Sequence, residues 1–190
     1  MLYTSSNLDL QKYENILGAI GDVFGNEVPT LKVDNKTIEN FTTPLDNLKQ
    51  DVENLINNNG YSSSIKLEEN SRGITIHILE EIVFPSGSAD LKKGSLIVLS
   101  QLGAIIRKLP NDIRIEGHTD NVPISNAAFP SNWHLSVARA LNTAYYLVNK
   151  ENLAADKVSI VGFSEYKPIE TNETPAGRAS NRRVDIVIIK

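Results

Sequence analysis

The sequence predicts an α+β fold, an α/β sandwich in which helices pack on a mixed β-sheet and further helices precede it. After residue 60, segments that alternate apolar and polar residues are interspersed with segments that have apolar residues at helical spacing. The first two alternating segments flank a short turn, which predicts an antiparallel hairpin. Where a helix separates two later segments, the βαβ order predicts parallel neighbours joined by right-handed crossovers.

The composition limits the function classes. A chain of 190 residues allows one domain with appendages or two small domains. A net charge of −4 argues against a nucleic-acid binder. The first 70 residues carry 11 acidic and 5 basic side chains, whereas the remainder has 12 acidic and 14 basic ones, which indicates two differently built parts.

The chain has no cysteine, which excludes disulfides, zinc–thiolate sites and thiol nucleophiles. It has no run of 18 apolar residues, and its start lacks the basic and apolar regions of a signal peptide. We therefore expect a soluble chain, although an extracytoplasmic fragment of a longer protein would have the same features.

A first helix is expected over residues 7–25, followed by a linker over 26–41. Its apolar residues at helical spacing are Leu10, Tyr13, Ile16, Leu17, Ile20, Val23 and Phe24. Gly18 and Gly21 each weaken this helix by roughly 1 kcal/mol relative to alanine. Two interpretations remain open, a helix packed on the protein and an amphipathic helix that lies on a surface or docks on a partner.

A second helix is expected over residues 44–59. Thr42 or Thr43 caps it, Pro44 occupies its first position, and Gly60 follows its end. Its apolar stripe consists of Leu45, Leu48, Val52, Leu55 and Ile56. A one-sided stripe needs a partner, so the helix packs on the following domain or on a copy of itself.

The hairpin and a third helix come next. Ile65 and Leu67 alternate before the turn "ENSRG", and Ile74, Ile76 and Ile78 alternate after it. A loop containing Pro85, Ser86 and Gly87 then leads into a helix. The residues expected to face the core from this helix are Leu91, Ile97, Val98, Leu102, Ile105, Ile106 and Leu109.

The last part of the chain completes the sheet. We expect, in order, a strand over 112–117, a helix over 131–150, a strand over 157–163, a loop through Gly177 and a strand over 183–190.

The strand "IRIEGHTD" delivers three polar side chains, His118, Thr119 and Asp120, to its end. His118 and Asp120 offer two metal ligands, with His77 and His134 as remote candidates. No spacing matches a zinc or calcium motif, so we expect no metal.

Hydrolysis is a second alternative for the same residues. Ser131 and Ser136 lie near His118 and Asp120 in the sequence, but there is no G-x-S-x-G elbow. A general acid–base pair stays conceivable, whereas the simplest interpretation of His118 is that it orients the turn.

The helix after this strand carries two stripes. The expected inner face is Leu135, Ala138, Leu141 and Tyr145, and the polar stripe is Asn132, Ser136, Arg139 and Thr143. The polar stripe can return to the end of the strand, where ligands bind on sheets of this type. Asp120 and Arg139 then either pair with each other or, held apart, bind a zwitterion, with the carboxylate accepting from an ammonium and the guanidinium gripping a carboxylate.

The diaminopimelate of peptidoglycan stem peptides is such a zwitterion. Two charge-assisted hydrogen bonds contribute roughly 3–6 kcal/mol, which corresponds to binding weaker than micromolar. Many copies along a polymer make this affinity sufficient for anchoring.

Four stretches, "IVFPSGSADL", "IEGHTDNVPI", "FPSNWHLSVARA" and "TPAGRASNRRVDIVI", resemble in order the motifs of the OmpA C-terminal-like peptidoglycan-binding domain. The resemblance covers roughly residues 70–190 and implies a βαβαβ core. Within that superfamily, "DNVPI" followed by "FPSNW" resembles the MotB family of flagellar stator proteins. OmpA- and Pal-type members usually lack this insert.

The resemblance implies a binding site without catalysis or cofactor. Asp120 and Arg139 would hold diaminopimelate, and Thr119, Asn132 and Leu135 would line the same groove. His118, Ser136, Arg182 and Arg183 are accessory candidates, and of the two arginines one would face the groove while the other satisfies local carboxylates. His134 stands where the family often has Glu, so the usual capping partner of Ser131 is missing.

The resemblance also implies a domain organisation and partners. Residues 1–27 would form a plug-like amphipathic segment that regulates ion flow, 28–60 a linker and connecting helix, and 61–190 the peptidoglycan-binding domain. A transmembrane helix that pairs with a MotA-type partner would precede this fragment, which would act as a homodimer outside the cytoplasm. The alternatives are an OmpA- or Pal-type anchor unrelated to motility, a wall-cleaving enzyme, and a purely structural domain.

Overall fold

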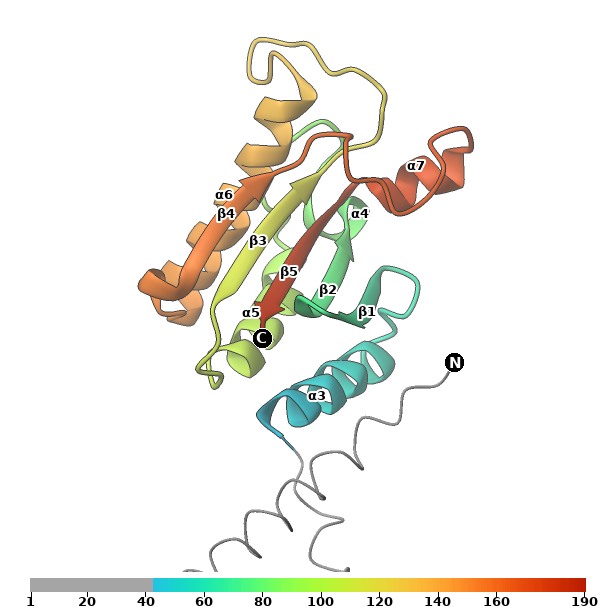
Figure 1. Cartoon of the computed structure of the whole chain (residues 1–190). Helices are drawn as coiled ribbons and strands as arrows, with labels where there is room; N and C mark the ends of the chain where they lie inside the picture. The colour runs from blue at the N-terminus through green and yellow to red at the C-terminus, as the bar shows by residue number, and fades with distance from the viewer. Residues whose placement is uncertain (1–42) are drawn as a thin grey trace, which may run out of the picture. The chain divides into compact units, whose positions relative to one another are not determined.

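The computed structural model of the protein describes residues 43–190 (Figure 1). The helix expected over 7–25, the linker over 26–41 and the plug-like segment lie outside these residues.

Five strands form one mixed sheet, in the order β1-β2-β5-β3-β4. The strands are β1 (Ile65–Asn70), β2 (Gly73–Leu79), β3 (Ile113–His118), β4 (Val158–Gly162) and β5 (Arg183–Ile189). β3 and β4 pair in parallel, as predicted for strands joined by a helix, and the other pairs are antiparallel. The last strand, β5, enters the middle of the sheet between β2 and β3.

The described part of the chain has five α-helices around this sheet. They are α3 (Pro44–Asn58), α4 (Glu80–Val83), α5 (Ser95–Ile106), α6 (Asn132–Glu151) and α7 (Pro175–Asn181), with a 3₁₀ turn at Ala155–Lys157. α5 and α6 lie behind the sheet in Figure 1, and α7 leads into β5.

Two of these helices correct the sequence prediction. α4 and α7 occupy segments that we expected to be loops. With four and seven residues they are too short to show a helical period. α7 nevertheless has a recognisable start, since Thr174 accepts a hydrogen bond from the Gly177 amide and Pro175 follows it.

The prediction for α3 is confirmed in detail. Thr43 is the N-cap, and its hydroxyl accepts from the Asp46 amide at 3.2 Å while the Asp46 carboxylate accepts from the Thr43 amide at 2.9 Å. Leu48, Val52 and Leu55 are buried in the core of the domain. Of the two partners expected for this stripe, the structure shows the following domain, at α5 and β1.

The expected inner face of α6 is wrong for Leu141 and Tyr145, whereas Leu135 is buried as predicted. Leu141 and Tyr145 are 48% and 67% exposed, whereas Arg139 and Thr143 are fully buried. The prediction placed the apolar residues on the inner face, but a polar side chain can also be buried when it has hydrogen-bond partners. Thr143 donates to the Arg139 carbonyl at 2.9 Å, and small or apolar residues beside the polar stripe complete the buried face.

A smaller error concerns α5. Ile97, expected in the core, is 62% exposed, while Val98, Leu102 and Ile106 are buried as predicted. Leu91, which was assigned to the same helix, precedes it.

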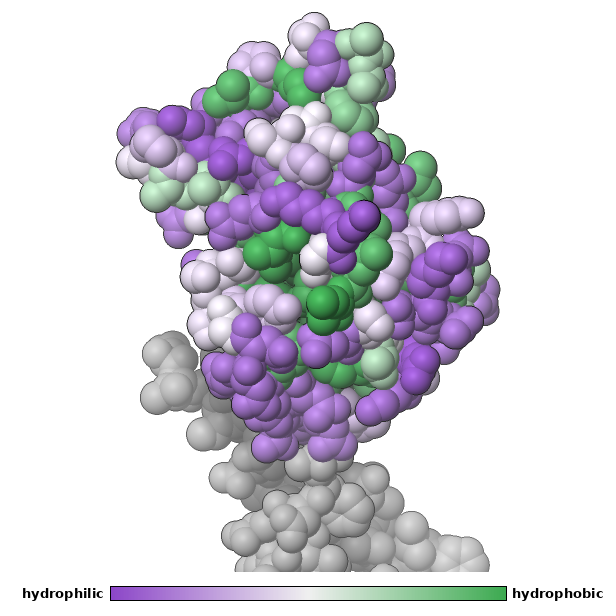
Figure 2. All heavy atoms as spheres, turned by 180° about the vertical axis from the view of Figure 1, so that it is seen from behind, coloured by the Kyte–Doolittle hydropathy of each residue, from purple (hydrophilic) through white to green (hydrophobic). Residues whose placement is uncertain are grey.

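The turned-out face of α6 leaves apolar side chains at the surface. Trp133, Val137, Leu141 and Tyr145 are all exposed there, and Trp133 stacks on Tyr166 with 5.4 Å between ring centroids. The domain seen from behind is mostly hydrophilic, with hydrophobic residues both in a central area and near the top of the view (Figure 2). Between residues 43 and 190, no helix combines the length and apolarity needed to cross a bilayer.

Glycine allows α6 to approach the sheet at the end of β3. A Cβ added at Gly117 would overlap the carbonyl oxygen of Ser136, and one at Gly162 would overlap Val137. The first turns of α6 therefore lie directly against the ends of the parallel strands, which places its polar stripe beside Asp120.

Candidate functional site

A groove of about 440 Å³ lies where β3 ends and α6 begins. The structure brings six predicted residues together there, namely Thr119, Asp120, Asn132, Leu135, Arg139 and the accessory candidate Arg182. The other residues that line it are Glu80, Ser86, Gly87, Val122, Pro123, Ile124 and Arg178.

Asn132 holds the loop that follows Asp120. Its side-chain Nδ2 donates to the carbonyl of Val122 at 3.1 Å and to that of Asp120 at 3.3 Å. Its side-chain Oδ1 accepts from the Ile124 backbone amide at 3.2 Å. Thr119 donates its hydroxyl to the Asp120 carbonyl at 2.9 Å. These two side chains thus fix the position of the carboxylate.

Arg139 lies at the base of the groove and is only 1% exposed. Its Nη2 lies 2.8 Å from Glu80 Oε1, its Nε donates to the Ser88 carbonyl at 2.9 Å, and its guanidinium stands over the Phe84 ring at 5.2 Å. Burial lowers the pKa of Arg139 below its ordinary value, and the adjacent Glu80 carboxylate opposes this shift. The side chain is therefore held on three sides.

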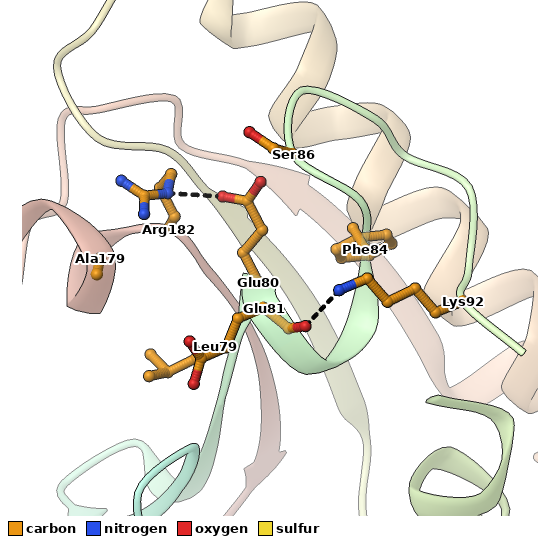
Figure 3. Close-up of a pocket in the computed structure, with 8 residues that line it drawn as sticks. All are labelled: Leu79, Glu80, Glu81, Phe84, Ser86, Lys92, Ala179 and Arg182. Carbon is orange, nitrogen blue, oxygen red and sulfur yellow. Dashed lines mark hydrogen bonds and ion pairs between the residues drawn. The ribbon is translucent and has the colours of Figure 1, made fainter. Parts of the chain in front are cut away.

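Arg182 lies between the two carboxylates of the groove. Its Nη1 donates to Asp120 Oδ2 at 2.6 Å, and its Nε forms an ion pair with Glu80 Oε2 at 2.8 Å (Figure 3). Burial opposes the charge of Arg182, but the hydrogen bond to Asp120 and the charge of Glu80 outweigh it and raise its pKa. Asp120, Arg182, Glu80 and Arg139 thus form one chain of alternating charge.

This chain replaces the direct pair that the sequence left open. Within residues 43–190, the ion pair of Asp120 is with Arg182, and that of Arg139 is with Glu80. Two carboxylates and two guanidiniums together can bind a ligand that carries both an ammonium and a carboxylate.

Glu80 was missed by the sequence analysis. It follows the last residue of β2 and is 6% exposed. Its position in the sequence, beside Glu81 and ahead of an apolar turn, does not distinguish it from a surface residue. Only its contacts with Arg139 and Arg182, which come from distant segments, make it a site residue.

Three accessory candidates lie away from the groove. Ser136 is buried, donates to the Trp133 carbonyl at 3.0 Å and accepts from the Ser164 amide at 3.1 Å. Arg183 contacts both carboxylate oxygens of Asp185 at 3.1 Å. Of the two neighbouring arginines, Arg182 therefore lines the groove and Arg183 neutralises a local carboxylate.

His118, the third of these candidates, belongs to a second cluster. Its Nε2 lies 3.2 Å from Asp185 Oδ2, and His77 Nδ1 lies 2.8 Å from Asp185 Oδ1. Burial alone would raise the pKa of Asp185, but the two imidazoles and the charge of Arg183 lower it well below its ordinary value. The cluster is a network of paired buried charges.

Within residues 43–190, this cluster contains the one group of three side chains whose ligand atoms lie close enough together to hold a metal ion. Ligand atoms of Glu116, His118 and Asp185 lie within 4.8 Å of one another. Arg72 lies 3.0 Å from Glu116, and Arg183 forms an ion pair with Asp185. Both carboxylates are therefore already neutralised by arginine side chains. These contacts favour a structural role over metal binding.

Comparison with known proteins identifies the family. Residues 83–182 match the OmpA family. The whole chain is 34% identical to the uncharacterized protein YtxE of Bacillus subtilis, of which it covers 81%. It is 31% identical to Motility protein B of the same organism, again over the whole chain and 83% of that protein. The chain belongs to the OmpA family.

The OmpA-family domain of this chain is a non-catalytic peptidoglycan-binding domain. Its fold is that of the cell wall anchor of the T6SS from Pseudomonas aeruginosa, with a TM-score of 0.65 and 30% identity over 71% of this chain and 94% of that one. The predicted α+β class with a mixed sheet is confirmed, as is the prediction that the domain is not an enzyme.

Proposed function

We propose that this protein anchors a flagellar motor stator to the cell wall, by binding diaminopimelate-type centres of peptidoglycan in the groove between β3 and α6. The observation that carries the proposal is the alternating charge of Asp120, Arg182, Glu80 and Arg139 around one groove of an OmpA-family domain. The likeness of the whole chain to Motility protein B supports the assignment to motility.

The groove offers complementary groups for a zwitterionic amino-acid centre. Asp120 accepts from the ammonium, Arg139 provides positive charge for the carboxylate, and Leu135 provides an apolar contact for the methylene chain. Thr119 and Asn132 act by holding the Asp120 loop. None of these steps makes or breaks a covalent bond.

The stator assignment includes parts outside the described residues. We infer that residues 1–27 regulate ion-channel activation, that the protein works as a homodimer, and that it pairs with a MotA-type membrane protein. The domain then lies outside the cytoplasm, in reach of the wall, attached to a membrane anchor.

A wall anchor unrelated to motility is the second candidate. The likeness to the cell wall anchor of the T6SS, a different machine, favours it. Deleting the gene in its own host separates the two candidates. Loss of swimming with intact flagella supports the stator, whereas normal swimming with altered envelope integrity supports the other anchor.

Co-sedimentation of the full chain with purified peptidoglycan sacculi tests wall binding. We expect the parent to sediment with sacculi, and Asp120→Ala and Arg139→Lys to lose most of this binding while remaining folded. Asp156→Ala is the matched control, because Asp156 is exposed in the 3₁₀ turn before β4, at the end of the parallel strands β3 and β4 that is far from the groove. A folded parent that stays in the supernatant would contradict the proposal, and binding that survives both site changes would remove the groove from it.

A further inference from the structure

We propose that Arg182 is a latch that the ammonium of the ligand displaces from Asp120, and that the displaced Arg182 selects ligands with a free carboxylate beside that ammonium. This inference rests on the proposed function and deepens it. It assigns the groove to a zwitterionic amino-acid centre, in preference to the same centre with a carboxamide or with no carboxylate.

The binding atom of Asp120 is occupied in the unliganded protein. Oδ2 accepts from Arg182 Nη1 at 2.6 Å, and Oδ1 accepts from the Val122 amide at 3.1 Å. The carboxylate is only 9% exposed. An ammonium that approached Oδ2 would meet the guanidinium of Arg182 at a distance where two like charges repel strongly. Binding to Asp120 therefore requires Arg182 to leave.

Arg182 is free to move in a way that Arg139 is not. Its side chain is 37% exposed, against 1% for Arg139. Arg139 is held by Glu80, by the Ser88 carbonyl and by the Phe84 ring. Arg182 has a second contact at Glu80 Oε2, and Figure 3 shows this ion pair at the side of the guanidinium nearest its backbone. Release from Asp120 is then a swing about the contact with Glu80.

Charge balance shows what this swing requires. Once Asp120 is taken by the ammonium, Glu80 is the one carboxylate within residues 43–190 that still forms ion pairs with Arg139 and Arg182. Arg178 also lines the groove and adds positive charge. A carboxylate on the ligand restores the balance and accepts hydrogen bonds from the freed guanidinium. A carboxamide supplies no negative charge, and an amine without a carboxylate supplies no acceptor.

The test uses three stem tripeptides that differ at one position. The first ends in diaminopimelate with a free side-chain carboxylate. The second ends in diaminopimelate whose side-chain carboxylate is a carboxamide. The third ends in lysine, which has the ammonium but no side-chain carboxylate. Each peptide is titrated into the full chain and into its Arg182→Gln and Arg182→Lys variants, and binding is followed by calorimetry or NMR. Asp156→Ala serves as the control for a charge change outside the groove.

We expect the parent to bind the free acid about 10-fold or more tightly than the other two peptides, the effect of one charge-assisted contact. Arg182→Gln should reduce this preference to about 3-fold or less, mainly because the carboxamide and lysine peptides no longer compete with a guanidinium. The preference of Arg182→Lys for the free acid should lie between those of the parent and Arg182→Gln, because lysine keeps the positive charge but cannot donate two parallel hydrogen bonds to a carboxylate.

Three results would overturn the latch. If folded Arg182→Gln kept the full preference for the free acid, the latch would be wrong while wall binding through Asp120 stood. If the folded parent bound none of the peptides and no sacculi, the proposed function would fail and the latch with it. Peptides that fail to bind while sacculi do bind would reject the latch alone.

Discussion

Glu80 is buried between two guanidiniums, with one oxygen 2.8 Å from Arg139 and the other 2.8 Å from Arg182. A buried charge of this kind is tolerated because its neighbours carry the opposite charge. At the scale of single residues, Glu80 therefore links stability to binding, since it forms ion pairs with the buried Arg139 and with the more exposed Arg182.

Replacing Glu80 tests this link. Glu80→Gln leaves Arg139 without a counter-charge in the interior, so we expect a loss of about 3 kcal/mol in the free energy of unfolding, measured by urea denaturation. Glu53→Gln is the control, since Glu53 is exposed on α3. Equal stability of the two variants would show that Arg139 does not depend on Glu80.

His77 makes stability depend on pH. Burial alone would lower the pKa of His77, but its hydrogen bond to Asp185 and the charge of that carboxylate raise it on balance. Because the folded-state pKa is raised, this stabilisation is fully present below the unfolded value of about 6.5 and is lost as pH rises through the folded value.

We therefore expect the melting temperature of the parent to fall as pH rises above about 6.5, and the fall to be smaller in His77→Gln. His134→Gln, which removes an exposed imidazole on α6, is the control and should keep the slope of the parent. A slope unchanged by His77→Gln would assign the pH dependence to other groups.

At the scale of elements, the approach of α6 to the end of β3 builds the groove. The Ser136 carbonyl occupies the space that a side chain at position 117 would need. The same contact sets the distance between Asp120, which lies two residues beyond the end of β3, and Arg139, which lies about one turn further along α6 than Ser136. The geometry of the site thus depends on one helix–strand contact.

Gly117→Ala should push α6 away from the sheet. We expect a loss of about 2 kcal/mol or more in the free energy of unfolding, and weaker sacculus binding, because the methyl group would overlap backbone atoms. Gly94→Ala is the control, since a Cβ there meets nothing within 4 Å. The idea fails if both alanine variants are as stable as the parent.

At the scale of the whole molecule, α3 belongs to the same core as the sheet. Leu48, Val52, Leu55 and Ile56 join one buried cluster with residues of β1, β2 and α5. A domain boundary at residue 61, as the sequence suggested, would cut through this cluster and expose its apolar side chains.

A chain that starts at residue 61 should therefore be less stable than one that starts at residue 43. We expect a melting temperature lower by about 10 °C or more, because several buried leucine-sized contacts of about 1.5–3 kcal/mol each are lost. Equal melting temperatures would show that α3 does not stabilise the domain, and would support the predicted domain boundary at residue 61. Double substitution of Leu48 and Val52 by alanine in the full chain gives an independent measurement.

The sequence by itself determined the features that depend on neighbouring residues. Thr43 and Pro44 specify the start of α3, the alternation of apolar residues specifies β1 and β2, and Gly117 with Asp120 marks the end of β3. Four motifs in order also pointed to the family. These features are local because caps, turns and hydrophobic periods act within a few residues.

The tertiary structure decided which polar residues are buried and what they face. Glu80 meets Arg139 from 59 residues away, and Asp120 meets Arg182 from 62 residues away, once β5 has entered the sheet between β2 and β3. The polar stripe of α6 could turn inward only because these partners were in place. A buried charge is stable only beside its counter-charge, and the chain brings the two together only when it folds.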